Sequence, residues 1–120
     1  MQYIMLVYQS PEWAGLSKEE KNRVHAECTA WHEELVKSGR ARTAAGLQPV
    51  STATTVREKN GKPLITDGPF AETREVLGGF EIIECQHLDE ALAIAKRFPS
   101  LRVGFSLEVR PLVTGPCHED

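Results

Sequence analysis

One short stretch of the chain places a carboxylate, an aromatic ring and a rigid bend next to one another. The run Asp67-Gly68-Pro69-Phe70 cannot continue a regular helix or strand, because Gly permits positive φ and Pro fixes φ and lacks an amide donor. A densely charged run, Ala71-Glu72-Thr73-Arg74-Glu75, follows directly. Because a rigid polar corner can hold side chains in place, this bend is the first candidate for a functional site.

Asp67 is the first candidate catalytic residue, and its carboxylate has two interpretations. At the start of a turn, an Asp often accepts hydrogen bonds from backbone amides two residues on, which would be a structural role. The same carboxylate could instead contact a ligand or partner a catalytic base. Both interpretations remain open from the residues alone.

Histidine supplies the second candidate. His25 and His32 are seven residues apart in a segment with helical periodicity, so they share a flank beside its apolar stripe. A half-buried His32 with a carboxylate partner can transfer protons near neutral pH, and Asp67 is the candidate partner. The alternative is a His32 bound to a backbone carbonyl or to solvent. Helical metal ligands prefer spacings of three or four, so neither a metal nor a cofactor is expected.

A predicted substrate-binding set surrounds this pair: Phe70, Arg74, Glu75 and Arg110. Arginine can hold a carboxylate through two parallel hydrogen bonds, so Arg74 or Arg110 could bind an anion. The alternative is that these charges form ordinary ion pairs that support the loop.

Composition narrows the class of protein. A chain of 120 residues fits one domain, predicted at 1–113, with a loose tail at 114–120. The net charge of -3 argues against nucleic acid, and no stretch reaches the roughly 20 apolar residues of a membrane span. No signal peptide is evident at the start, so a cytoplasmic location is expected. Three distant cysteines predict no disulfide framework, and Cys28 is expected to be a packed thiol.

Periodicity and turn residues predict the elements that must position these side chains. Ser17 and Glu20 form a capping box for a helix that should end near Lys37 or Ser38, before Gly39. Strands are expected at residues 2–8, 40–47, 53–58, 62–66, 76–85 and 106–112, and a second helix at 88–98. Asn60-Gly61 predicts a hairpin turn, and Gly78-Gly79 a bulge or a close backbone approach.

The order of these elements predicts a ferredoxin-like βαββαβ sandwich of the α+β class with an inserted β-hairpin. Two helices would cover one face of an antiparallel sheet. Phe80 and Ile82 should point to one face of the long strand and Ile83 to the other, so both faces of the sheet are apolar. Self-association is the simplest cover for the second face, and a homodimer is therefore predicted.

Several segments together resemble one known family. They are Thr55-Val56-Arg57, the run from Thr66 to Glu75, Leu77-Gly78-Gly79-Phe80, Leu88-Asp89-Glu90-Ala91 and Glu108-Val109-Arg110-Pro111. The chain is similar over nearly its whole length to the DGPF branch of the YCII-related proteins, a mainly bacterial family. The resemblance implies the dimeric α+β barrel fold, which agrees with the order of the elements.

The resemblance also implies two classes of function. Some distant YCII-related proteins are dehydrochlorinases that use a His and an Asp, which implies isomerisation or HX elimination on a lactone-like organic acid. His32 matches the family's His, whereas Phe98-Pro99 stands where many members have Asp-Pro, so Asp67 is expected to replace that acid. Other members occur beside sigma factors, which implies a non-catalytic binding or regulatory module instead.

Overall fold

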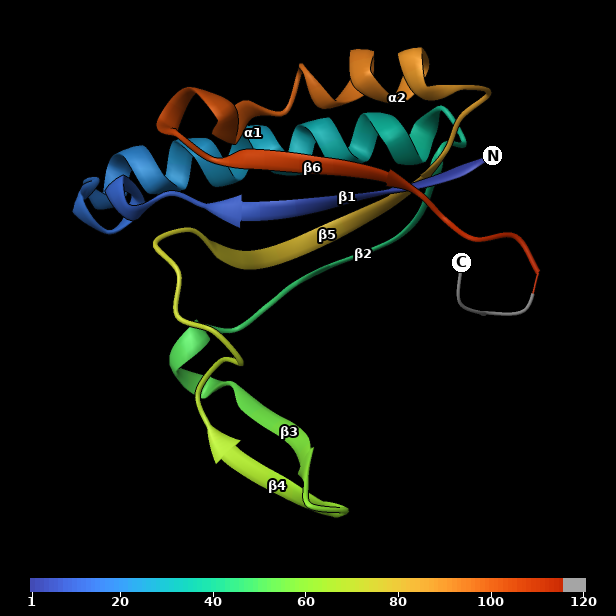
Figure 1. The fold of residues 1–120 in the computed structure, drawn as a ribbon. Helices are drawn as coiled ribbons and strands as arrows, with labels where there is room; N and C mark the ends of the chain where they lie inside the picture. Colours follow the sequence, from blue (N-terminus) through green and yellow to red (C-terminus); the bar gives the residue numbers. More distant parts are fainter. Residues whose placement is uncertain (116–120) are drawn as a thin grey trace.

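The computed structural model describes residues 1–115 as a two-layer α+β domain (Figure 1). Two helices lie over one face of a four-stranded sheet, and a separate two-stranded hairpin projects beyond it. The elements in chain order are β1 (Gln2–Gln9), η1 (Pro11–Gly15), α1 (Lys18–Lys37), β2 (Ala41–Gly46), η2 (Val50–Thr52), β3 (Thr54–Lys59), β4 (Lys62–Asp67), β5 (Val76–Glu84), α2 (Leu88–Ala95), η3 (Pro99–Val103) and β6 (Ser106–Pro111).

The main sheet has the strand order β2-β5-β1-β6, and all of its pairings are antiparallel. With the β3–β4 hairpin set aside, this is the order of a ferredoxin-like βαββαβ sandwich, which confirms the fold class predicted from the sequence. Both βα units cross over on the same side, so α1 and α2 form one layer and leave the opposite face of the sheet without helices.

Helix α1 forms as its sequence predicts. The Ser17 hydroxyl accepts a hydrogen bond from the Glu20 amide at 3.1 Å, and Gly39 adopts a φ of 76° just beyond the last turn. Val24, Trp31 and Leu35 on its apolar stripe are buried, and the Trp31 indole donates to the Ile94 carbonyl of α2 at 3.2 Å. The long helix is therefore fixed to both the sheet and the second helix.

Strand alternation divides the sheet into two faces. Tyr3, Met5 and Ile83 point toward the helices and are buried, with Met5 and Ile83 fully inaccessible. The opposite side, which we call the open face, carries half-buried apolar side chains: Ile4, Leu6, Tyr8, Phe80 and Ile82. The prediction that Phe80 and Ile82 share a face opposite Ile83 is confirmed.

A bulge interrupts β5 at the two adjacent glycines. Val7 pairs with Gly79 and Tyr8 with Leu77, so Gly78 is the extra residue on the bulged strand. A Cβ on Gly79 would lie 2.8 Å from the Ala45 carbonyl oxygen, closer than real Cβ contacts allow. Both predicted roles of Gly78-Gly79, a bulge and a close backbone approach, are present.

The β3–β4 hairpin, which we call the arm, extends away from the body of the domain (Figure 1). Its turn is Asn60-Gly61, with φ values of 53° and 78°, as the sequence predicts. All its strand residues are exposed except Thr55, which is half-buried. At its base the Gly68 amide donates to the Ala53 carbonyl at 2.7 Å and the Thr55 hydroxyl to the Gly68 carbonyl, and farther along β3 Arg57 donates to the Phe70 carbonyl.

The second helix departs from its predicted bounds. It ends at Ala95 rather than Phe98, and a 3₁₀-helix begins at Pro99, because a helix disfavours the residue that precedes a proline. Ala91, Ile94 and Ala95 form its buried side, whereas Leu88 at its start is 47% exposed. Most of the predicted tail lies outside the described residues, and none of the described helices is long and apolar enough to cross a membrane.

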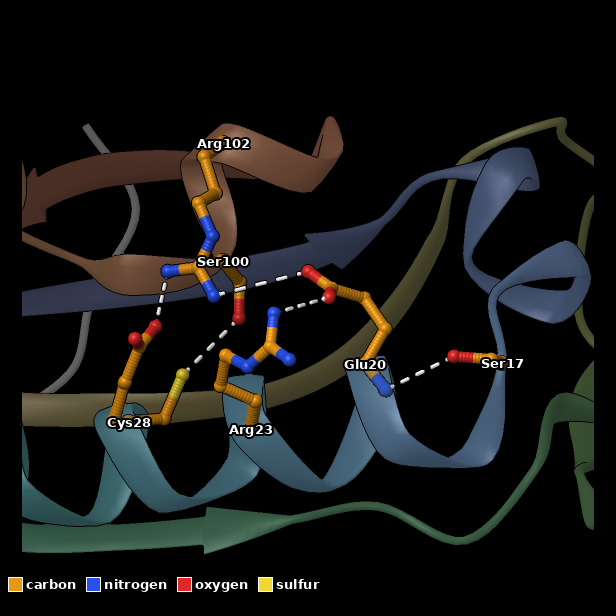
Figure 2. A network of polar contacts seen from close by, with 7 residues as sticks. Ser17, Glu20, Arg23, Cys28, Ser100 and Arg102 are labelled. Atoms are coloured by element: carbon orange, nitrogen blue, oxygen red, sulfur yellow. Dashed lines mark hydrogen bonds and ion pairs between the residues drawn. The ribbon is translucent and has the colours of Figure 1, made fainter.

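An ion-pair network ties η3 to α1 (Figure 2). The Arg102 guanidinium contacts the carboxylates of Glu20 and Glu27, which lie about two turns apart on α1, and the Glu27 hydrogen bond raises the pKa of Arg102 above its usual value. Beside Glu27, the Cys28 thiol and the Ser100 hydroxyl lie 3.1 Å apart. The acidic flank of α1 is therefore paired with arginine, and the pairing holds η3 beside the helix.

Candidate functional site

A cavity of about 360 Å³ lies between α1 and the edge of the sheet. Its floor comes from β2 and β5, where three of the helix-facing residues are small. Ala44 lies opposite Glu81 and Gly46 opposite Gly79, so among these four residues Glu81 alone extends a long side chain toward the helix. The cavity exists because the floor lacks side chains where the core would otherwise be filled.

The cavity is lined from above by α1 and from the side by aromatic rings. His25, Cys28 and His32 line the cavity from the helix, and its side wall includes Trp31, Phe98 and Phe105. The rings of Trp13 and His25 lie 5.3 Å apart, and those of Trp13 and Phe105 5.1 Å apart, so an aromatic group continues beyond the cavity. In the described part of the chain, no lysine or arginine lines this cavity.

His32 and Glu81 form a hydrogen-bonded pair in this cavity. The Nδ1 atom of His32 lies 2.9 Å from Oε1 and 3.0 Å from Oε2 of Glu81. The Glu81 side chain is 7% exposed, whereas that of His32 is 39% exposed. The carboxylate is thus enclosed behind the imidazole, and the imidazole is the member of the pair that a molecule from solvent can reach.

The environment of Glu81 works against its ionisation. Burial between Met5 and Ala44 raises the pKa of this carboxyl above its ordinary value, while the hydrogen bond and charge of His32 lower it by a smaller amount. A buried carboxylate whose main polar partner is one imidazole is costly to keep without that partner. The ionised form of Glu81 therefore depends on its contact with His32.

The geometry of the pair defines what it can do. An ionised Glu81 accepts a hydrogen bond from the protonated Nδ1 of His32. This contact selects the tautomer of His32 whose Nε2 has a free lone pair. That Nε2 can accept a proton from a bound molecule, and the nearby carboxylate stabilises the imidazolium that results. The arrangement is suited to general acid–base chemistry on a molecule bound in the cavity.

Asp67, the predicted partner of His32, lies elsewhere. It is the last residue of β4, it is exposed, and it pairs with Thr54 across the arm. His32 is instead hydrogen bonded to Glu81, and Asp67, at the base of the arm, is not among the residues that line this cavity. Among the described residues, no side-chain hydrogen bond from Asp67 holds the turn, which is fixed by Thr55 and by Arg57 donating to the Phe70 carbonyl.

The predicted substrate-binding residues are dispersed over three surfaces. Phe70 is 76% exposed and lines a second, more apolar cavity at the base of the arm. Arg74 and Glu75 line a third hollow beside η1 and η3, and Glu75 also accepts a hydrogen bond from the Ser106 hydroxyl at 3.3 Å. Arg110 is paired with Glu108 on β6. None of the four lines the cavity that holds His32.

Glu81 is the residue that sequence reasoning missed, although the sequence contains a signal for it. The strand 80–83 reads Phe-Glu-Ile-Ile, and alternation puts Glu81 on the same side as the core residue Ile83. A single acid on the helix-facing side of a central strand needs a polar partner. Across the described residues, no group of three or more His, Cys, Asp or Glu could hold a metal ion.

Comparisons with known proteins agree with this architecture. The model of the YCII-related domain matches residues 1–113. An uncharacterised protein of Rhizobium meliloti (strain 1021) is 40% identical over 114 residues, which cover 93% of this chain and 92% of that protein.

A solved structure gives the same fold at low sequence identity. It is a 5-chloro-2-hydroxyhydroquinone dehydrochlorinase from Burkholderia phenoliruptrix in complex with 2,5-dihydroxybenzoquinone. The TM-score is 0.57 with 16% identity, and the match covers 96% of each chain. With the sequence matched over nearly its whole length and the fold shared, this chain belongs to the family of YCII-related domain proteins.

Proposed function

We propose that this protein is an enzyme that acts on a small molecule. In it, His32 transfers a proton, and Glu81 orients the imidazole and stabilises its protonated form. The observation that carries the proposal is the Nδ1-to-carboxylate contact of 2.9 Å at the wall of an open cavity. A hydrogen-bonded His–carboxylate pair with one member enclosed and the other accessible is the arrangement that general acid–base catalysis requires.

The reaction class follows from the proton transfer that the His32–Glu81 pair can carry out. Nε2 of His32 takes a proton from a carbon or hydroxyl of the substrate, and the electron pair of the broken bond enters the substrate's π system. In an elimination, that electron pair expels halide from the neighbouring position, and His32 later returns its proton to solvent. In an isomerisation, the same proton returns to another atom of the substrate. Neither route needs an oxidant, since HX is lost as a proton and an anion.

The cavity favours a neutral, planar substrate. A volume of about 360 Å³ suits a single ring, and the aromatic wall of Trp31, Phe98 and Phe105 can pack on its face or edge. The sequence led us to expect a lactone-like organic acid held by arginine, but Arg74 and Arg110 lie on other surfaces. A hydroxylated ring, like the hydroquinone and quinone of the solved relative, fits better than a carboxylate.

The test uses 5-chloro-2-hydroxyhydroquinone as the first probe and measures released chloride. Hydrogen–deuterium exchange into the unchlorinated ring in D₂O provides a second readout that needs no leaving group. We expect His32→Gln to lower turnover by at least about 100-fold. Asp67→Asn should leave turnover near that of the wild type. Loss of turnover in Asp67→Asn together with full activity in Glu81→Gln would reject the assignment.

A non-catalytic binding module is the second candidate. The same cavity would then hold a ligand without transforming it, and the exposed arm could contact a protein. Binding of the ring compounds by calorimetry, with neither chloride release nor exchange, would favour this alternative. The link to sigma factors remains a prediction from the family resemblance.

We also propose that the protein works as a homodimer. Ile4, Leu6 and Phe80 on the open face are apolar, and no layer formed by residues 1–115 covers them. Burying such a face is the usual solution for a sheet with helices on one side only. Sedimentation equilibrium at micromolar concentration tests this directly, since a monomer would contradict it.

A further inference from the structure

The arm presents apolar side chains that are exposed within the described part of the chain. Val56 on β3 and Ile65 on β4 are directly opposite each other, and each is 66% exposed. Leu64 on the other side of the arm is 41% exposed. Two β-branched side chains directly opposite each other stabilise a sheet. In the single chain, however, Val56 and Ile65 are exposed to water.

A hairpin of this kind is not stable by itself. Two-stranded hairpins are marginal in water, and independent stability needs a third strand or a packed hydrophobic face. The contacts that hold the arm lie at Thr55, Arg57 and Gly68, and not along Val56 or Ile65. A well-formed arm therefore points to a surface that packs against it.

The open face and the base of the arm line one cavity. Its volume is about 560 Å³, with Tyr8 of the open face on one wall and Phe70 and Leu77 on others. Phe70 is 76% and Leu77 42% exposed. A single partner that covers the open face would therefore also reach the arm.

The size of the uncovered surface indicates a second copy of the chain. The accessible area is 8553 Å², whereas a compact monomer of 13.3 kDa exposes about 6,400 Å². The radius of gyration is 16.4 Å, against about 14 Å for a compact chain of this length. An excess of roughly 2,000 Å² per chain, or about 4,000 Å² for two copies, falls within the roughly 2,000–5,000 Å² that an obligate homodimer buries over both chains.

The charges on the surface are consistent with self-association. Glu108 and Arg110 lie on the open face itself, opposite Leu6 and Ile4, and are paired to each other there. A patch that holds one acid and one base is self-complementary about a two-fold axis, because the acid of each copy can approach the base of the other.

We propose that the arm packs its Val56–Ile65 side on a second copy of this chain and acts as a clasp. This inference rests on the proposed homodimer and adds a contact to it. Each arm reaches past the edge of its own sheet, so a two-fold axis gives two equivalent clasps. The arm is ordered by the partner, and its backbone hydrogen bonds are protected only in the dimer.

The test compares dimer dissociation constants by sedimentation for Ile65→Lys, Val56→Lys and the wild type. We expect each arm substitution to weaken the dimer at least about tenfold. The matched control is Val36→Lys, because Val36 is a β-branched residue 55% exposed on α1 in the helix layer, and its dimer should be unchanged. Leu6→Lys on the open face should also weaken the dimer, independently of the arm.

Hydrogen exchange provides the second measurement. Amides of residues 54–67 should exchange slowly well above the dissociation constant and become unprotected on dilution below it. A dimer whose dissociation constant is unchanged in both arm variants but raised in Leu6→Lys would overturn the clasp and leave the homodimer standing. A wild-type monomer at 100 μM, a concentration chosen to detect even weak dimers, would overturn both.

Discussion

Both carboxylate oxygens of Glu81 lie within hydrogen-bond distance of the same atom, Nδ1 of His32, at 2.9 and 3.0 Å. The imidazole thus points at the middle of the carboxylate rather than at one oxygen. Glu81 reaches this position from a central strand and His32 from the fourth turn of a capped helix. The layer contact between helix and sheet therefore fixes the pair, and no loop has to order to form it.

The first prediction concerns the role of the carboxylate. Glu81→Gln keeps the shape of the side chain and can accept from Nδ1, but it cannot stabilise an imidazolium. We expect turnover to fall by about 100-fold or more while ligand affinity changes little. Steady-state kinetics with a calorimetric binding measurement separates the two effects. Glu84→Gln, on the same strand but on its opposite face, is the matched control and should retain activity.

The second prediction concerns stability as a function of pH. Burial raises the pKa of Glu81 above its ordinary value of 4.5, so the folded state holds this proton more tightly than the unfolded state does. The stabilising contribution is complete below pH 4.5 and is lost as pH rises through the folded-state pKa. Relative to Glu81→Gln, the wild type should lose free energy of unfolding across that interval. Urea titrations of both proteins at several pH values measure the difference, and parallel profiles would contradict the raised pKa.

The third prediction concerns the glycines that form the cavity floor. Gly79→Ala places a Cβ against the Ala45 carbonyl oxygen and should destabilise the fold by about 1–3 kcal/mol. Gly46→Ala meets no atom within 4 Å, so its free energy of unfolding should change by less than about 1 kcal/mol. Its methyl group would enter the cavity instead and lower ligand affinity. Equal destabilisation of the two variants in urea titrations would show that the close approach at Gly79 is relaxed in solution.

The fourth prediction uses Cys28 as a reporter of cavity occupancy. Cys28 lines the cavity and is half-buried, whereas Cys85 is 3% exposed and burial raises the pKa of its thiol. In a Cys117→Ser background, iodoacetamide should modify Cys28 first, and a ring ligand should slow that modification several-fold. Mass spectrometry of the native protein identifies the site. Modification at an unchanged rate under saturating ligand would place the ligand outside this cavity.

The fold was largely predictable because its signals are local. The capping box at Ser17, the turn at Asn60-Gly61 and the alternation along β5 each depend on a few neighbouring residues. The early end of α2 shows the limit of helical periodicity, since Leu88–Phe98 keeps an apolar pattern past the point where Pro99 ends the helix.

The site was less predictable because it depends on contacts between distant segments. His32 was identified from its place beside the apolar stripe, but its partner is 49 residues away and was sought in the motif with the most unusual sequence. Asp67 sits in that motif on the arm, where the bend joins strands. The inward orientation of Glu81 was implied by alternation, yet only the packing of α1 on β5 shows that His32 reaches it.

The bare floor of Ala44, Gly46 and Gly79 separates two properties that many active sites combine. The volume available to a ligand is set there by absent side chains, while the proton chemistry is set by His32 and Glu81 above and beside it. Relatives could diverge in the molecules they accept by gaining or losing single methyl groups on β2, with the acid–base machinery intact. Selectivity in this fold is therefore open to change in small steps along one edge strand.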